Sequence, residues 1–393
     1  MSTVVVTDGD ERAALAIVRS LGRAGSSVHV CATRSRSLAG ASRYCSSSSI
    51  VANPLSEKDQ FVGDVVKLCS RVRADLLFPV SEASLLAILA ARDEFDARIP
   101  FPAAEVFENV SDKALVLERA RTLGIPVPEQ RMITGIPTAT EISALPFPVV
   151  VKPTRSVPRQ GERRRKGTVS YARNAKELVQ ILQELDSLSY PVLLQERIEG
   201  PGVAVSVLIW NGKLRAAFAH RRIREKPPSG GVSVLSEAIP LDARLLSQSA
   251  SLLETFAWEG VAMVEYKIDS RTGTPYLMEI NGRFWGSLQL AIDSGVDFPR
   301  LLLEAATGIA ANAATQYRHG SKLRWEWGDV DNLIAMIRRN GSRSATQSWP
   351  GRARAITGFI SAFRPGVRNE VLRLRDPAPF GRETIDWWKG VLS

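Results

Sequence analysis

Hydrophobic positions in the first hundred residues form short continuous runs that alternate with helical stripes. The runs at 4–6, 27–32 and 76–80 are typical of strands buried in a parallel sheet. Between and after them, apolar residues spaced three and four apart predict helices over 14–21 and 84–91. This alternation predicts a small doubly wound α/β domain.

The turn after the first strand is short and acidic. Thr7-Asp8-Gly9-Asp10 contains no G-x-G-x-x-G pattern, so dinucleotide binding is not expected there. Asp8 or Asp10 is a suitable N-cap for the helix that follows, and we expect one of them to cap and pack that helix.

Beyond residue 111 the pattern changes to antiparallel strands with interspersed helices, which predicts an α+β region. A helix over 111–121 is followed by the stop signal Gly124, and Asn211-Gly212 predicts a tight hairpin turn. Further helices are expected from Asn174 and over 243–257. The expected strands are 147–152, 168–172, 192–195, 205–210, 214–219, 262–268 and 276–280.

Composition excludes several protein classes. The 393 residues are 45% hydrophobic and 23% charged, and no apolar run is long enough to span a membrane. The first residues do not resemble a signal peptide, and Cys31, Cys45 and Cys69 lack CxxC spacing. We therefore expect a reduced, cytoplasmic protein without disulfides or a zinc site.

Positive charge is concentrated in two places. The net charge is +10, and from Arg318 onward 14 Lys and Arg stand against 7 Asp and Glu. A second basic cluster lies in the loop 153–167. This excess favours an anionic partner, which could be a nucleotide, a nucleic acid or a membrane surface.

Two glutamates and an asparagine form the strongest chemical pattern. Side chains alternate along strands, so Glu265 faces one side of its strand, and Glu279 and Asn281 share a face of the next. Folding about residue 272 places Glu265 opposite Glu279, where two carboxylates repel unless a positive charge lies between them. A hard cation such as Mg²⁺ would resolve this, whereas the alternatives are a solvated acidic face or pairing with Lys267 or Arg283.

Two lysines stand at unusual positions. Lys152 ends an apolar strand, and Lys113 lies in the first turn of a helix, where a cation is unfavourable unless it serves a ligand. Each taken alone is compatible with an ordinary solvated surface lysine.

In this order, these residues resemble the ATP-grasp superfamily. Glu196-Arg197-Ile198-Glu199-Gly200, Val264-Glu265-Tyr266 and Met278-Glu279-Ile280-Asn281-Gly282-Arg283 are similar to its hinge and metal motifs. The resemblance points to the carbamoyl-phosphate-synthase-like, carboxylate–amine ligase branch. It implies an N-terminal pre-ATP-grasp (Rossmann-like) α/β domain over 1–110, a two-subdomain ATP-grasp domain over 111–308, and a basic, Trp-rich C-terminal extension over 309–393.

The resemblance also implies roles for individual residues. Lys113 and Lys152 match the lysines that hold the nucleotide phosphates, and Arg283 matches the arginine that faces the acyl phosphate. The metal ligands, Mg²⁺ with Mn²⁺ as an alternative, match Glu265, Glu279 and Asn281. The adenine hinge matches Gln195, Glu196, Arg197 and Ile198.

The sequence departs from the family at two places. Gly202 stands where many members have an acid that holds the ribose, and the loop 153–167 is long and Arg-rich instead of short and Gly-rich. We interpret this loop as a basic lid over the triphosphate, with a merely solvated loop as the alternative. In the segment 220–226, Arg222 and Arg224 share a predicted strand face and are the candidates for contact with phosphates and substrate.

The implied reaction is an ADP-forming ligation of a small-molecule carboxylate to an amine through an acyl phosphate. The alternatives are an ATP-binding protein without turnover, or a basic nucleic-acid- or membrane-binding protein on the same scaffold. The extension holds five of the eight tryptophans. They are expected to pack it onto the ligase, with peripheral membrane contact as the second interpretation; nucleic acid is not expected because no binding motif accompanies the charge. A homodimer is one expectation for the assembly.

Overall fold

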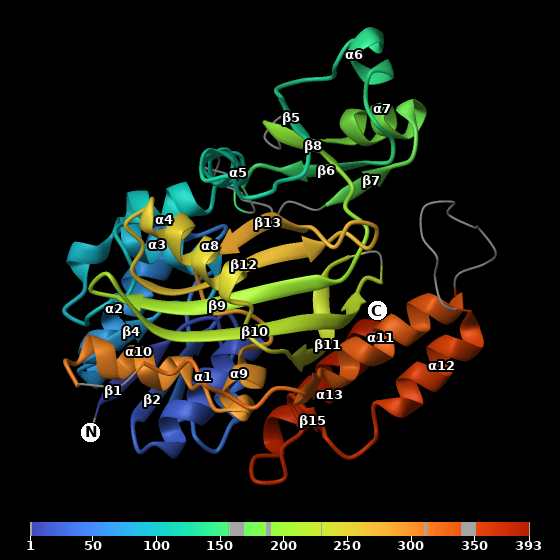
Figure 1. Cartoon of the computed structure of the whole chain (residues 1–393). Coiled ribbons are helices and arrows are strands. Elements are labelled where there is room, and N and C mark those ends of the chain that lie inside the picture. Colours follow the sequence, from blue (N-terminus) through green and yellow to red (C-terminus); the bar gives the residue numbers. More distant parts are fainter. Residues whose placement is uncertain are drawn as a thin grey trace.

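The computed structural model describes residues 2–155, 157, 169–185, 190–228, 230–309, 313–338 and 351–392. Most of the arginine-rich loop, from 158 to 168, lies outside the described residues, and with it the predicted lid. The described residues form three sheets (Figure 1). One is parallel and lies near the N-terminus, one is small and antiparallel, and the largest is formed by strands that follow residue 200.

The N-terminal domain is a parallel sheet with strand order β3-β2-β1-β4. Its strands are β1 (Thr3–Val6), β2 (Ser27–Ala32), β3 (Ser47–Ile50) and β4 (Leu76–Phe78), and its helices include α1 (Arg12–Arg23), α2 (Lys58–Val72), α3 (Glu82–Ala90) and α4 (Ala104–Val110). Val4, Val5 and Val6 are completely buried, as a strand covered on both faces requires. The expected doubly wound α/β fold is confirmed.

Asp8 has a different role from the one the sequence suggested. Neither Asp8 nor Asp10 caps α1, whose N-cap is Glu11 without a side-chain hydrogen bond. The Asp8 carboxylate instead accepts hydrogen bonds from the Ser81 N–H (2.9 Å) and the Ser84 hydroxyl (2.8 Å). It thereby ties the end of β1 to the start of α3. The expected cap was wrong because this partner lies more than seventy residues away along the chain.

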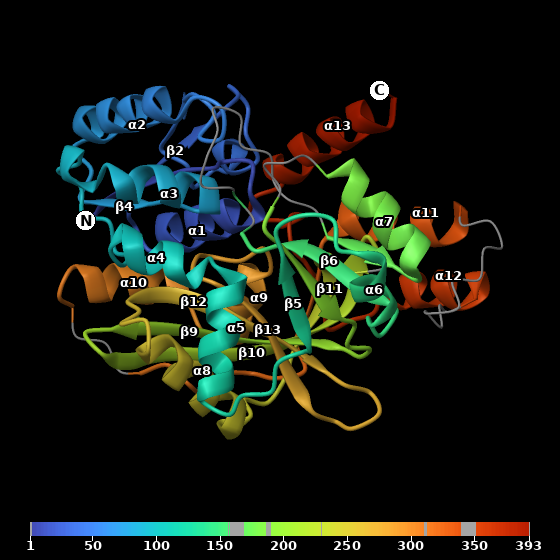
Figure 2. The same ribbon diagram turned by 90° about the horizontal axis from the view of Figure 1, so that it is seen from above.

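The small antiparallel sheet and its helices form a separate lobe. Its strands run in the order β5-β8-β6-β7. Their bounds are β5 (Gln130–Ile133), β6 (Val149–Pro153), β7 (Ser170–Ala172) and β8 (Val192–Glu196), with α6 (Ala139–Ser143) and α7 (Ala175–Glu184) beside them. Val149, Leu178 and Leu194 belong to a hydrophobic core that contains no residue of the other two sheets. The lobe projects from the large sheet, with α5 (Lys113–Thr122) next to it (Figures 1 and 2).

The large sheet has strand order β13-β12-β9-β10-β11-β14-β15. Its bounds are β9 (Gly202–Trp210), β10 (Lys213–Lys226), β11 (Val232–Ala238), β12 (Gly260–Ile268), β13 (Pro275–Asn281), β14 (Lys322–Arg324) and β15 (Val367–Asn369). Asn211 and Gly212 both have positive φ, as the predicted hairpin turn requires. With α8 (Ala243–Glu254), α9 (Leu288–Ser294) and α10 (Phe298–Ala306), this sheet shares one continuous core with the N-terminal domain.

The C-terminal extension adds β14 and β15 to the large sheet, together with α11 (Glu326–Arg338), α12 (Arg352–Ser361) and α13 (Ala378–Leu392). Stacked rings join α11 to α13 within the extension, with the Trp327 and Trp387 centroids 4.1 Å apart. The Arg12 guanidinium of α1 lies over the Trp325 ring (4.0 Å), in agreement with aromatic packing of the extension onto the rest of the chain. None of the described helices is long and apolar enough to cross a membrane. The domain boundaries at 110 and 308 stay predictions.

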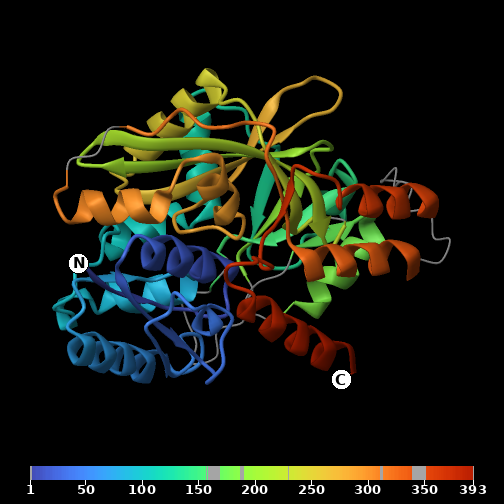
Figure 3. The same ribbon diagram turned by 90° about the horizontal axis from the view of Figure 1, so that it is seen from below.

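A buried arginine connects the extension to the N-terminal domain. Arg19 of α1 is fully buried, and its guanidinium donates to the Asp376 carboxylate (2.8 Å) and to the backbone carbonyls of Glu370, Val371 and Asp376. The Asp376 carboxylate also accepts from the Ser42 hydroxyl. Seen from below, α1 and the segment leading to α13 lie side by side (Figure 3). The two ends of the chain are thus joined by a buried ion pair.

We expect Arg19→Met to lower the free energy of unfolding by about 3–5 kcal/mol, because it leaves the Asp376 carboxylate buried without its partner. Urea denaturation monitored by tryptophan fluorescence measures this change. Lys67→Ala, at an exposed position of α2, is the control and should stay within about 0.5 kcal/mol of the parent. A small effect of Arg19→Met would contradict the assigned role.

Candidate functional site

The two glutamates face each other as the strand pattern predicted. Glu265 of β12 is paired directly with Glu279 of β13 in the antiparallel ladder. Asn281 lies two residues farther along β13, and its amide Nδ2 donates to Glu265 Oε1 (3.1 Å) and to Glu279 Oε1 (3.2 Å). The three side chains therefore converge on one point of the large sheet.

Two cations neutralise these carboxylates from opposite sides. Lys113 Nζ lies 3.1 Å from Glu279 Oε2, and the Arg222 guanidinium contacts Glu265 Oε1. Lys113 comes from the start of α5, where Asp112 is the N-cap and accepts from two backbone N–H groups. The first-turn position of Lys113 is thus balanced by a carboxylate 166 residues away in sequence, which explains why a cation is tolerated there.

The surroundings of the two carboxylates shift their pKa values in opposite directions. Burial raises the pKa of Glu279, but Lys113 and Lys152 outweigh burial and hold it at about 2. Burial also raises the pKa of Glu265. The Arg222 charge opposes this upward shift only in part, and the negative charge of Glu279 adds to it. Burial lowers the pKa of Lys113, yet Glu279 and Glu82 more than offset this and its pKa is raised. Glu279 is consequently held as an anion over the whole neutral range.

Lys152 brings a second ammonium group to the site from β6 of the small lobe. It is buried, and burial together with the Lys113 charge lowers its pKa to about 8, against the attraction of Glu279 and Glu265. Within the described residues its ammonium has no hydrogen-bond or ion-pair partner. A buried cation of this kind is unfavourable in isolation and suits a site that receives an anion.

The predicted hinge residues lie at the end of β8 and directly after it. Gln195 is buried and its Nε2 donates to Gln130 Oε1 (3.0 Å), whereas its own Oε1 has no partner in the described part of the chain. Glu196 N–H donates to the Glu129 carbonyl, and the Arg197 guanidinium lies over the Tyr171 ring. The backbone of Ile198 makes no hydrogen bond with any described residue. This segment can thus offer backbone groups to a planar ligand.

Arg283 follows β13 and fixes the orientation of Asn281. Its guanidinium donates to Asn281 Oδ1 (3.1 Å) and to the Phe284 carbonyl (3.0 Å). Asn281 therefore points its NH₂ group at the carboxylates, and the amide must turn over to offer its oxygen to a cation.

The donor set fits a hard cation only in part. Carboxylate and amide oxygens are the ligands that Mg²⁺ prefers. In the described ranges, however, no group of three or more His, Cys, Asp or Glu side chains is arranged to hold a metal ion. Glu265, Glu279 and Asn281 would leave most coordination positions to other oxygens, as is usual when the metal is bound jointly with substrate phosphates.

Arg222 and Arg224 do not act as a pair. A bulge interrupts the pairing of β10 with β11 between them, and one extra residue changes which face a side chain takes. Arg222 reaches Glu265, whereas Arg224 forms a two-pronged ion pair with Asp329 of α11 (2.6 and 2.7 Å). The expectation that both face the site is wrong for Arg224, which holds α11 against the sheet.

Gly202 leaves room for the Arg222 side chain to extend across β9 to Glu265. A Cβ built on Gly202 of β9 would lie 3.2 Å from Arg222 Cδ and 3.7 Å from Glu225 Oε1. An acid at this position would crowd the arginine and repel Glu225, which itself pairs with Arg222. Glu225 therefore places a carboxylate beside the position where the family acid is missing. The sequence analysis overlooked Glu225, although it lies in the segment 220–226 that was singled out.

Comparison with known proteins identifies the fold. Residues 189–328, which include the hinge, Arg222, Glu265, Glu279 and Asn281, match the family described as ATP-grasp in the biosynthetic pathway with Ter operon. The L-amino acid ligase from Bacillus licheniformis is similar with a TM-score of 0.62 and 17% identity, over 79% of this chain and 76% of that one. The chain has the ATP-grasp fold. The resemblance to the ATP-grasp superfamily that the motifs indicated is thereby confirmed.

Two other ATP-grasp structures are similar to nearly the same extent. Biotin carboxylase from Campylobacter jejuni, as a β,γ-ATP complex, has a TM-score of 0.63 and 17% identity, over 82% of this chain and 74% of that one. N5-carboxyaminoimidazole synthetase from Staphylococcus aureus with ADP gives 0.62 and 15%, over 82% and 80%. No curated protein matches the sequence significantly. At these identities the similarity concerns the ATP-grasp fold alone.

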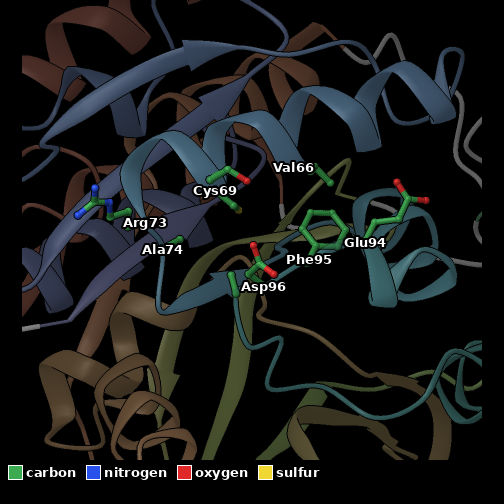
Figure 4. A pocket seen from close by; sticks show the side chains of 9 residues that line it. Val66, Cys69, Arg73, Ala74, Glu94, Phe95 and Asp96 are labelled. Carbon is green, nitrogen blue, oxygen red and sulfur yellow. The ribbon is translucent and has the colours of Figure 1, made fainter.

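A separate cavity of about 290 Å³ lies on the N-terminal domain, between α2 and the segment 94–97 (Figure 4). Cys69, Arg73 and Phe95 line it, and it contains none of the candidate residues. Ala74 leads into β4, so the cavity lies at the amino edge of the sheet, opposite to where open α/β sheets bind ligands. Burial raises the pKa of the Cys69 thiol to about 12, which makes it unreactive.

The lowered pKa of Lys152 predicts a pH-dependent affinity for nucleotides. A polyphosphate would bind the protonated lysine, so we expect association to require a proton once the pH exceeds the pKa of about 8. We expect the affinity for ADP without Mg²⁺ to be nearly constant between pH 7 and 8 and to fall by up to about tenfold per unit above pH 8. Calorimetric titration at several pH values measures this, and Lys152→Met should bind weakly with a flat profile over the same range.

Arg224 and Arg222 should respond differently to replacement. We expect Arg224→Met to lower the free energy of unfolding by about 2 kcal/mol. The loss is smaller than for a buried carboxylate left without any cation, because Asp329 keeps its ion pair with Arg324. Its affinity for ADP should stay within about twofold of the parent, whereas Arg222→Met should alter that affinity. Denaturation and calorimetry on both variants decide this; an Arg224→Met protein that folds normally but fails to bind ADP would contradict the assignment.

Proposed function

We propose that this protein is an ATP-dependent, ADP-forming ligase that joins a small-molecule carboxylate to an amine. The observation that carries the proposal is the convergence of Glu265, Glu279 and Asn281 with cations from different elements: Lys113 and Arg222 by contact, and Lys152 through its electrostatic coupling to both glutamates. Phosphoryl transfer needs in-line positioning and neutralisation of negative charge more than it needs covalent help. The cations of this site would supply the neutralisation.

In the proposed reaction a carboxylate oxygen of the acceptor attacks the γ-phosphorus of ATP. The bond between that phosphorus and the β,γ-bridging oxygen breaks, and ADP leaves. Lys113 and Lys152 hold the phosphates, and Arg283 faces the acyl phosphate. The amine nitrogen then attacks the acyl carbon, inorganic phosphate departs, and the amine loses a proton to solvent.

A magnesium ion, when bound, would neutralise phosphate charge at Glu265, Glu279 and Asn281. Before it binds, Lys113, Arg222 and the Asn281 amide offset the repulsion between the carboxylates. The carboxylates are thus already side by side, but Arg222 and the amide have to turn away when the cation enters.

The comparisons support ATP and Mg²⁺ as the pair used here. Solved neighbours include complexes with ADP, and a biotin carboxylase domain of Hydrogenobacter thermophilus with MgADP and bicarbonate. The hinge residues Gln195, Glu196, Arg197 and Ile198 would receive the adenine, because Ile198 has free backbone groups among the described residues. The carboxylate and the amine are the expected small-molecule partners.

The decisive variant is Glu279→Gln. It preserves the size of the side chain but replaces one of the two acceptor oxygens by an NH₂ group and removes the charge that Lys113 and the cation need. We therefore expect Mg²⁺-dependent ADP release to fall by about 10²–10³. The assay combines the protein with ATP, Mg²⁺ and pooled carboxylic acids and amines, with products identified by mass spectrometry. Far-UV circular dichroism should be unchanged.

Glu254→Gln, at an exposed position of α8, is the matched control and should retain parental activity. Full activity of Glu279→Gln would refute the site. If the parent binds ADP but releases none from ATP with any pool, the alternative of nucleotide binding without turnover replaces the ligase.

A further inference from the structure

The outer side of α12 exposes an uninterrupted apolar stripe. Ile356 and Ile360 of α12 are 41% and 61% exposed, and their spacing of four residues places them on one face. Phe363 in the turn after the helix is 68% exposed, and one side of its ring contacts the Arg324 guanidinium. Ala355 and Ala362 are buried against the rest of the extension. Three exposed large apolar side chains so close together are more than scattered surface residues, and such a patch marks an interaction site.

The stripe lies in the most basic part of the chain. The sequence from 337 to 375 contains nine arginines and a single acid, Glu370, which is buried. The helix itself has no acidic residue. Arg364 is exposed next to the stripe, and Arg338 is exposed at the end of the neighbouring α11, whereas Arg354 lies on the opposite face of α12. Arg368 and Arg373 pair with Asp293, so Arg338 and Arg364 are the exposed arginines that carry the argument. The surface therefore combines aliphatic and aromatic side chains with exposed positive charge.

This combination fits one partner better than others. A nucleic acid would use the arginines but would leave Ile356 and Ile360 against water, whereas an anionic bilayer accommodates both kinds of side chain. A second copy of the chain would bring identical positive charges together at a symmetric interface. Charge complementarity and apolar burial therefore both favour a membrane that contains anionic lipids.

The position of α12 also links the surface to the candidate site. α12 packs on α11, whose Asp329 binds Arg224 and whose Asn332 donates to the Glu225 carbonyl. Glu225 in turn pairs with Arg222, which contacts Glu265. In Figure 1, α11 and α12 lie together at one end of the molecule, beside the ends of β10 and β11. A docked protein would hold its site close to the lipid surface.

We propose that α12 and the turn after it dock on an anionic lipid bilayer, with Ile356, Ile360 and Phe363 inserted among the acyl chains and the arginines at the headgroups. This surface function does not depend on the ligase chemistry. It places the protein on a membrane rather than across it.

The test is sedimentation with vesicles of phosphatidylcholine alone or with about 30% phosphatidylserine. The parent should pellet with the anionic vesicles only, and less so at about 0.5 M salt than at about 0.1 M. Ile356→Ser/Ile360→Ser and Arg338→Gln/Arg364→Gln should each lower the partition coefficient by about tenfold or more. Ile50→Ser/Met132→Ser, two exposed apolar positions elsewhere, should bind like the parent.

ADP affinity and the unfolding midpoint should be unchanged in all three double variants, which excludes misfolding as the cause of lost binding. A parent that stays in the supernatant, or an Ile356→Ser/Ile360→Ser variant that binds equally well, would overturn the proposal. So would a single-stranded RNA that binds while vesicles do not, or a dimer in light scattering that this variant converts to monomer without any vesicle binding.

Discussion

Opposed carboxylates on adjacent strands are the constraint around which this molecule is organised. Glu265 and Glu279 are paired in the ladder and would repel each other in a metal-free protein. Lys113 from α5, Arg222 from β10 and the amide of Asn281 offset that repulsion. Several other features follow from it: the glycine at 202 that lets Arg222 cross β9, and the lysine in the first turn of α5. The cations of this site complement the negative charge of a polyphosphate, and its two glutamates complement the positive charge of a metal ion.

The division of the hydrophobic core explains how such a site can open. The small lobe has its own core, whereas the large sheet and the N-terminal domain share another. Lys152 and the hinge belong to the first body, and Glu265, Glu279 and Arg222 belong to the second. Lys113 connects them, because its side chain contacts Glu279 and its backbone N–H donates to the Thr154 carbonyl at the end of β6. Separate cores allow the lobe to move as a unit without unpacking either body.

The sequence predicted those parts of the site that depend on local periodicity. The pairing of Glu265 with Glu279 was correct because two alternating strands and a short polar turn determine the register. The separation of Arg222 from Arg224 was not predictable, since a β-bulge leaves no reliable trace in composition. Asp8 and Lys113 were ambiguous for another reason, namely that their partners lie far away in the chain. β14 and β15 were missed because three-residue strands rich in Lys and Arg have no hydrophobic pattern.

In the basic extension, the charges that face the rest of the protein differ from those on its outer surface. On α11, Asp329 and Asp331 neutralise Arg224, Arg324 and Lys226, and the buried Arg19 is matched by Asp376. These inward charges are paired because an unpaired buried charge is costly. The segment of α12 and the turn after it, by contrast, contains arginines but no acidic residue in its sequence, and it exposes Ile356, Ile360 and Phe363. A surface that serves only solubility needs charge but no exposed apolar stripe, and one that serves only packing would bury the stripe. The coexistence of both on one helix therefore indicates a partner that is itself anionic at its surface and apolar beneath it.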